Sequence, residues 1–188
     1  MELSKFFEGT DAVHESLRRI AAKLDELKIP YAVAGGMALN AHGYRRATVD
    51  VDVLVSPDGL ARVHAALEGL GYVPPFAGNK QLRDTQTSVR IEFLVAGGFP
   101  GDGKPKPVAF PDPATVGEVI GGIRFLKLPT LVELKLASGM TNAGRLKDLA
   151  DVQELIRALD LPIEFGSQLH PYVAGKYEEL WRAVKESD

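Results

Sequence analysis

A strand-like stretch with aspartates at alternate positions constrains the fold of this chain more than any other feature. Residues 46–55 read Arg-Ala-Thr-Val-Asp-Val-Asp-Val-Leu-Val. Because side chains alternate between the two faces of a strand, Asp50 and Asp52 share one face with Thr48 and Arg46. The opposite face is apolar and holds Ala47, Val49, Val51, Val53 and Val55. The pattern predicts a strand that is covered on its valine face and leaves its polar face open for chemistry.

The aspartate pair favours a cation. Two carboxylates about 6.5–7 Å apart on one strand face repel each other, and a divalent metal is a common partner for such a pair. A calcium loop of the EF-hand type is excluded, because Leu54 and Val55 stand where an oxygen ligand and a glycine would be required. The pair Gly35-Gly36 precedes Asp50 by thirteen intervening residues, and it predicts a turn that a phosphate group could approach closely.

Composition excludes several classes of protein. The 188 residues, 45% of them hydrophobic, fit one domain or one compact α/β unit with a helical appendage. No cysteine is present, so disulfides and thiolate metal sites are excluded. A net charge of −3 argues against a general nucleic-acid binder. With neither a signal sequence nor a membrane span in evidence, we expect a cytoplasmic protein without a membrane partner.

The hydrophobic periodicity and the turn residues predict an α/β (α+β) chain. We expect a mixed twisted sheet flanked by helices in residues 1–128, and a helical segment packed on that core in residues 129–188. A loop is expected over residues 96–113, which are rich in glycine and proline. The predicted helices are 11–28, 37–41, 57–70, 130–138, 144–159 and 166–185, and the predicted strands are 31–34, 48–55, 81–86, 89–95 and 123–128.

The glycine turn, the spacer and the Asp-x-Asp strand together resemble the nucleotidyltransferase superfamily that includes DNA polymerase beta. The matching residues are Ala34, Gly35, Gly36, Asp50, Val51 and Asp52. In that family the glycine turn contacts the nucleotide phosphates, the two aspartates hold the metals, and a third carboxylate comes from a later strand. The resemblance therefore implies the nucleotidyltransferase fold, and it gives the third position to Glu92.

Residues 31–155 look like the AbiEii-type and related minimal nucleotidyltransferases. The similarity rests on Gly35–Leu39, Arg46–Asp52, Leu134–Ser138 and Arg145–Asp151. It implies that Lys135 meets the nucleotide phosphates and that Asp148 lies near the site. The expected site residues are then Asp50, Asp52 and Glu92 as catalytic metal ligands, Gly35, Gly36, Met37, Thr48 and Lys135 for the nucleotide, and Arg46 and Asp148 in support.

Several of these residues have ordinary structural alternatives. Glu92 could form a salt bridge with Arg90 or Arg46, and Lys135 could be a solvated lysine that pairs with a neighbour. Lys147 and Asp151 are four residues apart, so a surface ion pair on a helix is the simpler interpretation of that pair.

The resemblance implies transfer of a nucleoside monophosphate from a nucleoside triphosphate (NTP) to a hydroxyl group, with Mg²⁺ or Mn²⁺ as the metal. The acceptor stays open between RNA or a tRNA end, a protein, and a small molecule. The AbiEii branch suggests a toxin with a cognate antitoxin, whereas drug-modifying members of the superfamily suggest an aminoglycoside or lincosamide. A non-catalytic nucleotide-binding regulatory protein is the alternative from a different class.

Overall fold

The computed structural model describes residues 3–187, which form two compact units. The first, the sheet unit, contains the described residues up to Ala41 together with Arg45–Ala96 and Pro111–Leu126. The second, the helical unit, contains His42–Tyr44, Gly97–Phe110 and the described residues from Lys127 onward. The predicted division into domains 1–128 and 129–188, with the second packed on the first, stays a prediction.

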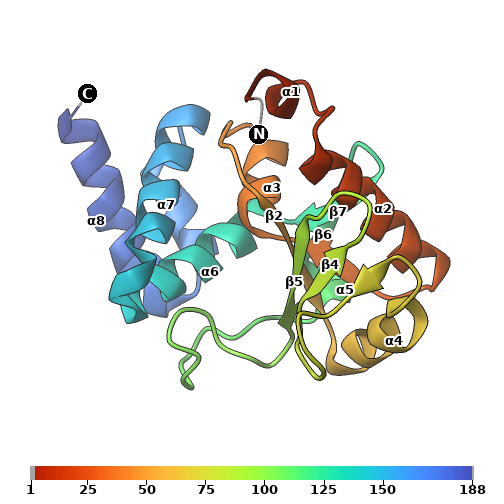
Figure 1. Cartoon of the computed structure of the whole chain (residues 1–188). Coiled ribbons are helices and arrows are strands. Elements are labelled where there is room, and N and C mark those ends of the chain that lie inside the picture. The colour runs from red at the N-terminus through yellow and green to blue at the C-terminus, as the bar shows by residue number, and fades with distance from the viewer. Residues whose placement is uncertain (1–2, 188) are drawn as a thin grey trace. The chain divides into compact units, whose positions relative to one another are not determined.

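A mixed sheet with strand order β3-β4-β5-β2-β1-β7-β6 forms the centre of the sheet unit (Figure 1). Strand β2 pairs in parallel with β5 and antiparallel with β1, and β1 pairs in parallel with β7. The remaining neighbours are antiparallel. The strands are β1 (Tyr31–Val33), β2 (Asp50–Val55), β3 (Tyr72–Val73), β4 (Leu82–Asp84), β5 (Arg90–Val95), β6 (Gly117–Ile120) and β7 (Ile123–Leu126).

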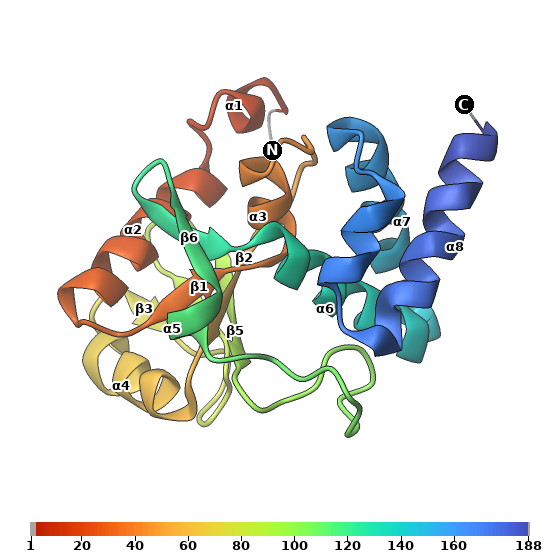
Figure 2. The ribbon, with the colours of Figure 1, turned by 180° about the vertical axis from the view of Figure 1, so that it is seen from behind.

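Helices α2 and α4 lie on the same side of strands β2 and β5 in both Figure 1 and Figure 2. Local signals start both helices: the Asp11 carboxylate accepts a hydrogen bond from the amide of His14, and Ser56 does the same for Gly59. The helices of this unit are α1 (Leu3–Phe7), α2 (Ala12–Glu26), α3 (Gly35–Ala41), α4 (Pro57–Leu67) and α5 (Pro113–Val116).

Burial follows the predicted alternation along β2 from Asp50 to Val53, after which Leu54 and Val55 are both buried. Val51, Val53 and Val55 are fully buried, and so are Ile20 and Leu24 of α2, a helix that contacts β2. Burying such side chains is the main stabilising term in a core of this kind. The valine face of β2 is thus covered, as predicted.

The prediction for Val49 was wrong. Its side chain is 68% exposed, because the strand begins only at Asp50 and Val49 precedes the ladder. Residues Gly35 and Gly36 also differ from the expected free turn, since they form the start of α3.

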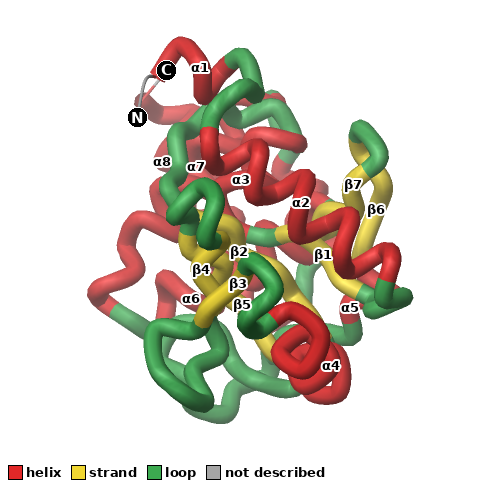
Figure 3. The backbone as a smooth tube through the Cα atoms, turned by 45° about the vertical axis from the view of Figure 1, so that its right-hand side comes forward, coloured by secondary structure: helices red, strands yellow, loops and turns green. Residues whose placement is uncertain are grey.

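Two further elements differ from the prediction. Strand β6 was not predicted. It forms a hairpin with β7, and the turn uses Gly121 and Gly122, both at positive φ. The hairpin projects from the sheet in Figure 3. The helix predicted over residues 166–185 is instead a 3₁₀ helix, Ile163–Gln168, followed by α8, Pro171–Ser187. Pro171 explains the break, because the residue before a proline avoids helical geometry.

Three α-helices build the helical unit: α6 (Leu128–Thr141), α7 (Leu146–Leu159) and α8, with a short 3₁₀ turn at Ala143–Arg145. Helix α7 contacts both α6 and α8. The predicted glycine- and proline-rich loop is present, and the side-chain amide of Asn142 donates to the carbonyl of Gly101 within it. No helix among the described residues is long and apolar enough to span a membrane.

Candidate functional site

Two neighbouring parallel strands bring the predicted carboxylates together in the sheet unit. The β2–β5 register pairs Asp52 with Glu92 and Asp50 with Arg90. Paired residues of adjacent parallel strands project from the same face, and the strands lie about 4.8 Å apart. Asp52 and Glu92 therefore start from adjacent positions on one face of the sheet, and all three carboxylates are partly exposed.

Gly35 gives the Asp52 carboxylate its space. A Cβ atom on Gly35 would lie 1.8 Å from Oδ2 of Asp52, and Gly35 has a φ of +57°. The backbone of Ala34 also donates to the carbonyl of Asp52 at 2.8 Å. The first glycine is thus required twice, by the backbone conformation and by the closeness of the acidic side chain.

Gly36 stands in a similar relation to Thr48. A Cβ on Gly36 would lie 2.7 Å from Cβ of Thr48, and the Thr48 hydroxyl donates to Oδ1 of Asp50 at 2.8 Å. Met37 follows as a buried residue of α3, with 3% of its surface exposed. Its side chain belongs to the core, so any contact of Met37 with a nucleotide would have to use its backbone.

Arg90 is a site residue that sequence reasoning treated only as a partner for Glu92. Its Nη2 donates to Oδ2 of Asp50 at 2.6 Å, and this hydrogen bond raises the pKa of the guanidinium. The attraction of Glu92 and Asp52 for Arg90 is weaker. The sequence signal was a basic residue at the start of the predicted strand 89–95, and the parallel register that places it opposite Asp50 comes from the structure.

Asn40 is a second residue that the sequence did not single out. Its side-chain amide donates to the carbonyls of Gly36 at 2.8 Å and Arg46 at 2.6 Å, and its Oδ1 accepts from the amide of Arg46 at 3.1 Å. Asn40 therefore fixes the backbone of Arg46 just before Thr48 and β2. The backbone of Arg46 is thus hydrogen-bonded to α3.

The donor set suits a hard divalent cation, because Asp50, Asp52 and Glu92 offer oxygen ligands from one sheet face. Gly35 leaves room for the carboxylate of Asp52, which strengthens this fit. As the side chains stand, however, no group of three or more histidine, aspartate or glutamate residues in the described chain is placed to hold a metal ion. Asp50 is bonded to Arg90 and Thr48 instead.

Lys135 and Asp148 lie in the helical unit, where they form a salt bridge with each other. The ammonium group of Lys135 contacts Asp148 at 3.0 Å and Asp151 at 2.7 Å, and Ser138 donates to Asp148 at 2.7 Å. Lys135 and Asp151 are buried, at 7% and 3% exposure, so the expected Lys147–Asp151 surface pair was wrong. Asp151 faces α6, where the lysine sits, and Lys147 is exposed.

The charges around Asp148 hold its pKa below the ordinary value. Burial alone would raise this pKa, but the charge of Lys135, the hydrogen bonds from Ser138 and Lys135, and the charge of Arg145 outweigh it. The cluster of Lys135, Ser138, Asp148 and Asp151 therefore ties α6 to α7.

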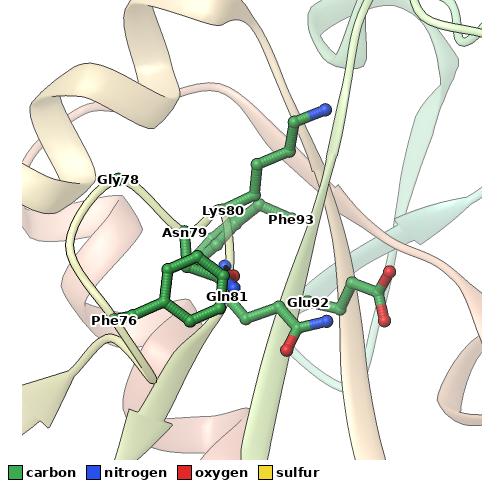
Figure 4. Close-up of a pocket in the computed structure, with 7 residues that line it drawn as sticks. All are labelled: Phe76, Gly78, Asn79, Lys80, Gln81, Glu92 and Phe93. Carbon is green, nitrogen blue, oxygen red and sulfur yellow. Dashed lines mark hydrogen bonds between the residues drawn. The ribbon is translucent and has the colours of Figure 1, made fainter.

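A hollow of about 320 Å³ opens beside Glu92 in the sheet unit. Its lining comes from β5, through Glu92 and Phe93, and from the segment that leads into β4 (Figure 4). The residues contributed by that segment are Phe76, Gly78, Asn79, Lys80 and Gln81. Glu92, the third carboxylate, thus lines the hollow together with residues that lead into β4.

Solved structures with a similar fold include those of nucleotidyltransferases. The crystal structure of ANT(2″)-Ia in complex with adenylyl-2″-tobramycin matches with a TM-score of 0.54 and 16% identity, over 92% of this chain and 97% of that chain. A protein from H. pylori proposed to be a nucleotidyltransferase matches with a TM-score of 0.51 and 17% identity, over 93% and 94% of the two chains. No protein-family model and no curated protein sequence matches the chain. The chain therefore has the nucleotidyltransferase fold.

Proposed function

We propose that the sheet unit transfers a nucleoside monophosphate from an NTP to a hydroxyl group and releases pyrophosphate. The observation that carries the proposal is the placement of Asp52 between two features. Gly35 lies against its carboxylate on one side, and Glu92 is its register partner on the other. The start of α3 next to two adjacent carboxylates is an arrangement that phosphoryl chemistry can use.

In the proposed reaction the acceptor oxygen attacks the α-phosphorus of the NTP. The bond from that phosphorus to the oxygen bridging to the β-phosphate breaks, and pyrophosphate leaves. The acceptor hydroxyl loses its proton to the carboxylate of Glu92, which is the one of the three on the strand farthest from the glycine turn. The backbone at Gly35 and Gly36 would bind the phosphates, and Thr48 orients Asp50 through its hydroxyl.

Asp50, Asp52 and Glu92 would hold Mg²⁺ or Mn²⁺. When bound, such an ion neutralises phosphate charge and favours loss of the hydroxyl proton. The positive charge of Arg90 partly balances the negative charge of Asp50 on this face of the sheet. We also propose that the helical unit assists the transfer reaction. In this role Lys135 would bind the triphosphate and Asp148 would support it. This role requires the ammonium group of Lys135 to serve the phosphates in addition to its two aspartates.

The acceptor has two candidates with separate support. The adduct named with ANT(2″)-Ia, adenylyl-2″-tobramycin, favours a small hydroxyl compound such as an aminoglycoside or a lincosamide. The resemblance to the AbiEii branch favours RNA or a tRNA end, and with it a toxin role opposed by an antitoxin. A protein hydroxyl is a further acceptor, and a nucleotide-binding regulator without catalysis is the alternative class.

The proposal is tested with each α-³²P-labelled NTP, Mg²⁺, and separate pools of RNA, protein and small hydroxyl compounds. Label should enter one pool with the natural protein and be lost with Asp50→Ala/Asp52→Ala. If nucleotide binds but no pool gains label above that double variant, the protein is a nucleotide-binding regulator and the transfer reaction is wrong.

A further inference from the structure

The hollow beside Glu92 has a composition suited to a planar, uncharged ring. Phe76 is 66% exposed, which is unusual for a phenylalanine unless its ring serves a contact. In Figure 4 the Phe76 ring is drawn beside Asn79, and the side-chain amide of Gln81 is drawn between that ring and Glu92, whose carboxylate points away from Phe76. An aromatic ring next to an amide is the combination with which proteins stack a nucleobase and bond its edge.

The polar groups of the hollow are available for a ligand. Within residues 3–187, no hydrogen bond or ion pair engages the side-chain head groups of Lys80, Gln81 or Glu92, apart from a longer-range attraction of Glu92 for Arg90. Asn79 uses its Oδ1 to accept the amide of Gln81 at 2.7 Å. This bond fixes the turn and leaves the Asn79 amide group as a donor.

The charge of the lining argues against a polycationic acceptor. Glu92 is its one carboxylate, and Lys80 adds a positive charge. An aminoglycoside carries several ammonium groups and would need several carboxylates, whereas a phosphate next to a nucleobase would suit Lys80. In Figure 4 the ammonium group of Lys80 points away from Glu92, so it could meet a phosphate without neutralising that carboxylate.

The strand order separates this hollow from the phosphate turn. Gly35 follows β1, whereas the hollow lies at β5 and β4, across β2 from β1. A ligand in the hollow would therefore approach the carboxylates from the side opposite the glycine turn, as the acceptor of an in-line displacement must.

We propose that the hollow is the acceptor subsite and that it receives a nucleobase, stacked on Phe76 and bonded by the amides of Asn79 and Gln81. Calling this hollow an acceptor subsite rests on the proposed function. The assignment favours a nucleotide over an aminoglycoside as the acceptor. A free nucleotide and the end of an RNA chain share this chemistry.

Binding in the absence of NTP tests the subsite directly. Adenosine 5′-monophosphate, a single-stranded ribotrinucleotide and tobramycin are titrated by calorimetry into the full chain. The nucleotides should bind, and Phe76→Ala should weaken them by about tenfold or more, the loss expected for one stacked base. Phe76→Trp should retain binding. Leu70→Ala is the matched control, because Leu70 is also exposed, at 76%, and lies outside the lining.

The binding measurements distinguish an RNA end from a free nucleotide, and they also test the subsite itself. Tighter, more salt-sensitive binding of the trinucleotide identifies an RNA end, and equal affinity identifies a free nucleotide. Unchanged nucleotide affinity in both Phe76→Ala and Gln81→Ala, or tobramycin binding that depends on Phe76, overturns the subsite.

In the transfer assay, Phe76→Ala should raise the KM for the acceptor and leave the KM for NTP unchanged. A rise in the KM for NTP alone would assign the hollow to the donor nucleotide and contradict the inference. If no transfer occurs at all while Phe76-dependent nucleotide binding persists, the proposed function fails and the nucleobase site stands.

Discussion

Asp52 occupies the space that a side chain on Gly35 would need: a Cβ there would lie 1.8 Å from the carboxylate oxygen Oδ2. Gly35→Ala should therefore move Asp52 as well as strain the backbone, which is at a φ of +57°. We expect transfer activity to fall by about 100-fold or more, because a displacement of about 1 Å has that effect on catalytic groups.

Gly69→Ala is the control for this variant. Gly69 also has a positive φ, +78°, but nothing lies within 4 Å of the place that a Cβ atom would take. Both variants should lose about 1–2 kcal/mol of stability to the backbone conformation. Only Gly35→Ala should lose activity; equal activity in the two variants would show that the Gly35–Asp52 contact does not matter for the reaction.

Arg90 is the cation that balances Asp50 in the structure. Removing it by Arg90→Ala should lower the melting temperature by no more than about 2–4 °C without divalent ions, since a pair this exposed contributes about 1 kcal/mol at most. Mg²⁺ should then raise the melting temperature more than in the natural protein, because the ion no longer competes with Arg90. Arg83→Ala, which removes an exposed arginine on β4, should show neither effect. An Mg²⁺ response equal to that of the natural protein would contradict the competition.

Asp84 is fully buried and joins β4 to α2. It accepts hydrogen bonds from Ser16 at 3.1 Å, from Arg19 at 3.0 Å and from the amide of Gln86 at 2.9 Å. Asp84→Ala should lower the free energy of unfolding by about 3–5 kcal/mol, because the buried hydroxyl of Ser16 and the partly buried guanidinium of Arg19 lose this acceptor. Urea denaturation measures this loss. Glu26→Ala, at an exposed pair with Lys23, should cost less than about 1 kcal/mol.

The lowered pKa of Asp148 predicts acid sensitivity in the helical unit. A carboxyl group with a depressed pKa in the folded state stabilises that state above its unfolded pKa, near 3.8, and this stabilisation is lost as pH falls through the folded value. The melting temperature should therefore drop steeply below about pH 4. Asp148→Asn should make this fall in melting temperature at low pH shallower. Asp160→Asn should change it much less, because Asp160 is exposed and solvent screens its attraction to Lys185. An unaltered fall in Asp148→Asn would show that the Lys135 cluster does not govern it.

Alternation within strands could be predicted from the sequence, and so could the elements that carry the site. The valines at every second position identified the buried face of β2, and in the structure Glu92 lies between the buried Ile91 and Phe93, on the other face of β5. The nucleotidyltransferase resemblance agrees with the fold of the chain. These features are local or periodic, so a single sequence can reveal them.

Partner choice could not be predicted, because it depends on strand register. Arg90 could have served Glu92 or Asp50, and only the parallel pairing of β2 with β5 places it opposite Asp50. Lys135 likewise forms salt bridges with Asp148 and Asp151 of the neighbouring helix α7, not with a residue of its own helix α6. The hollow at Phe76 was missed since it is built by an irregular segment that has no periodicity.

The central claim concerns which phosphate moves, and parallel incubations with α-³²P- and γ-³²P-labelled NTP test it most directly. Nucleotidyl transfer predicts that the α label enters the acceptor while the γ label appears in pyrophosphate. Both signals should fall in Glu92→Gln and persist in Glu26→Gln, an exposed control in the same unit. Entry of the γ label into the acceptor, or full activity of Glu92→Gln, would contradict the account.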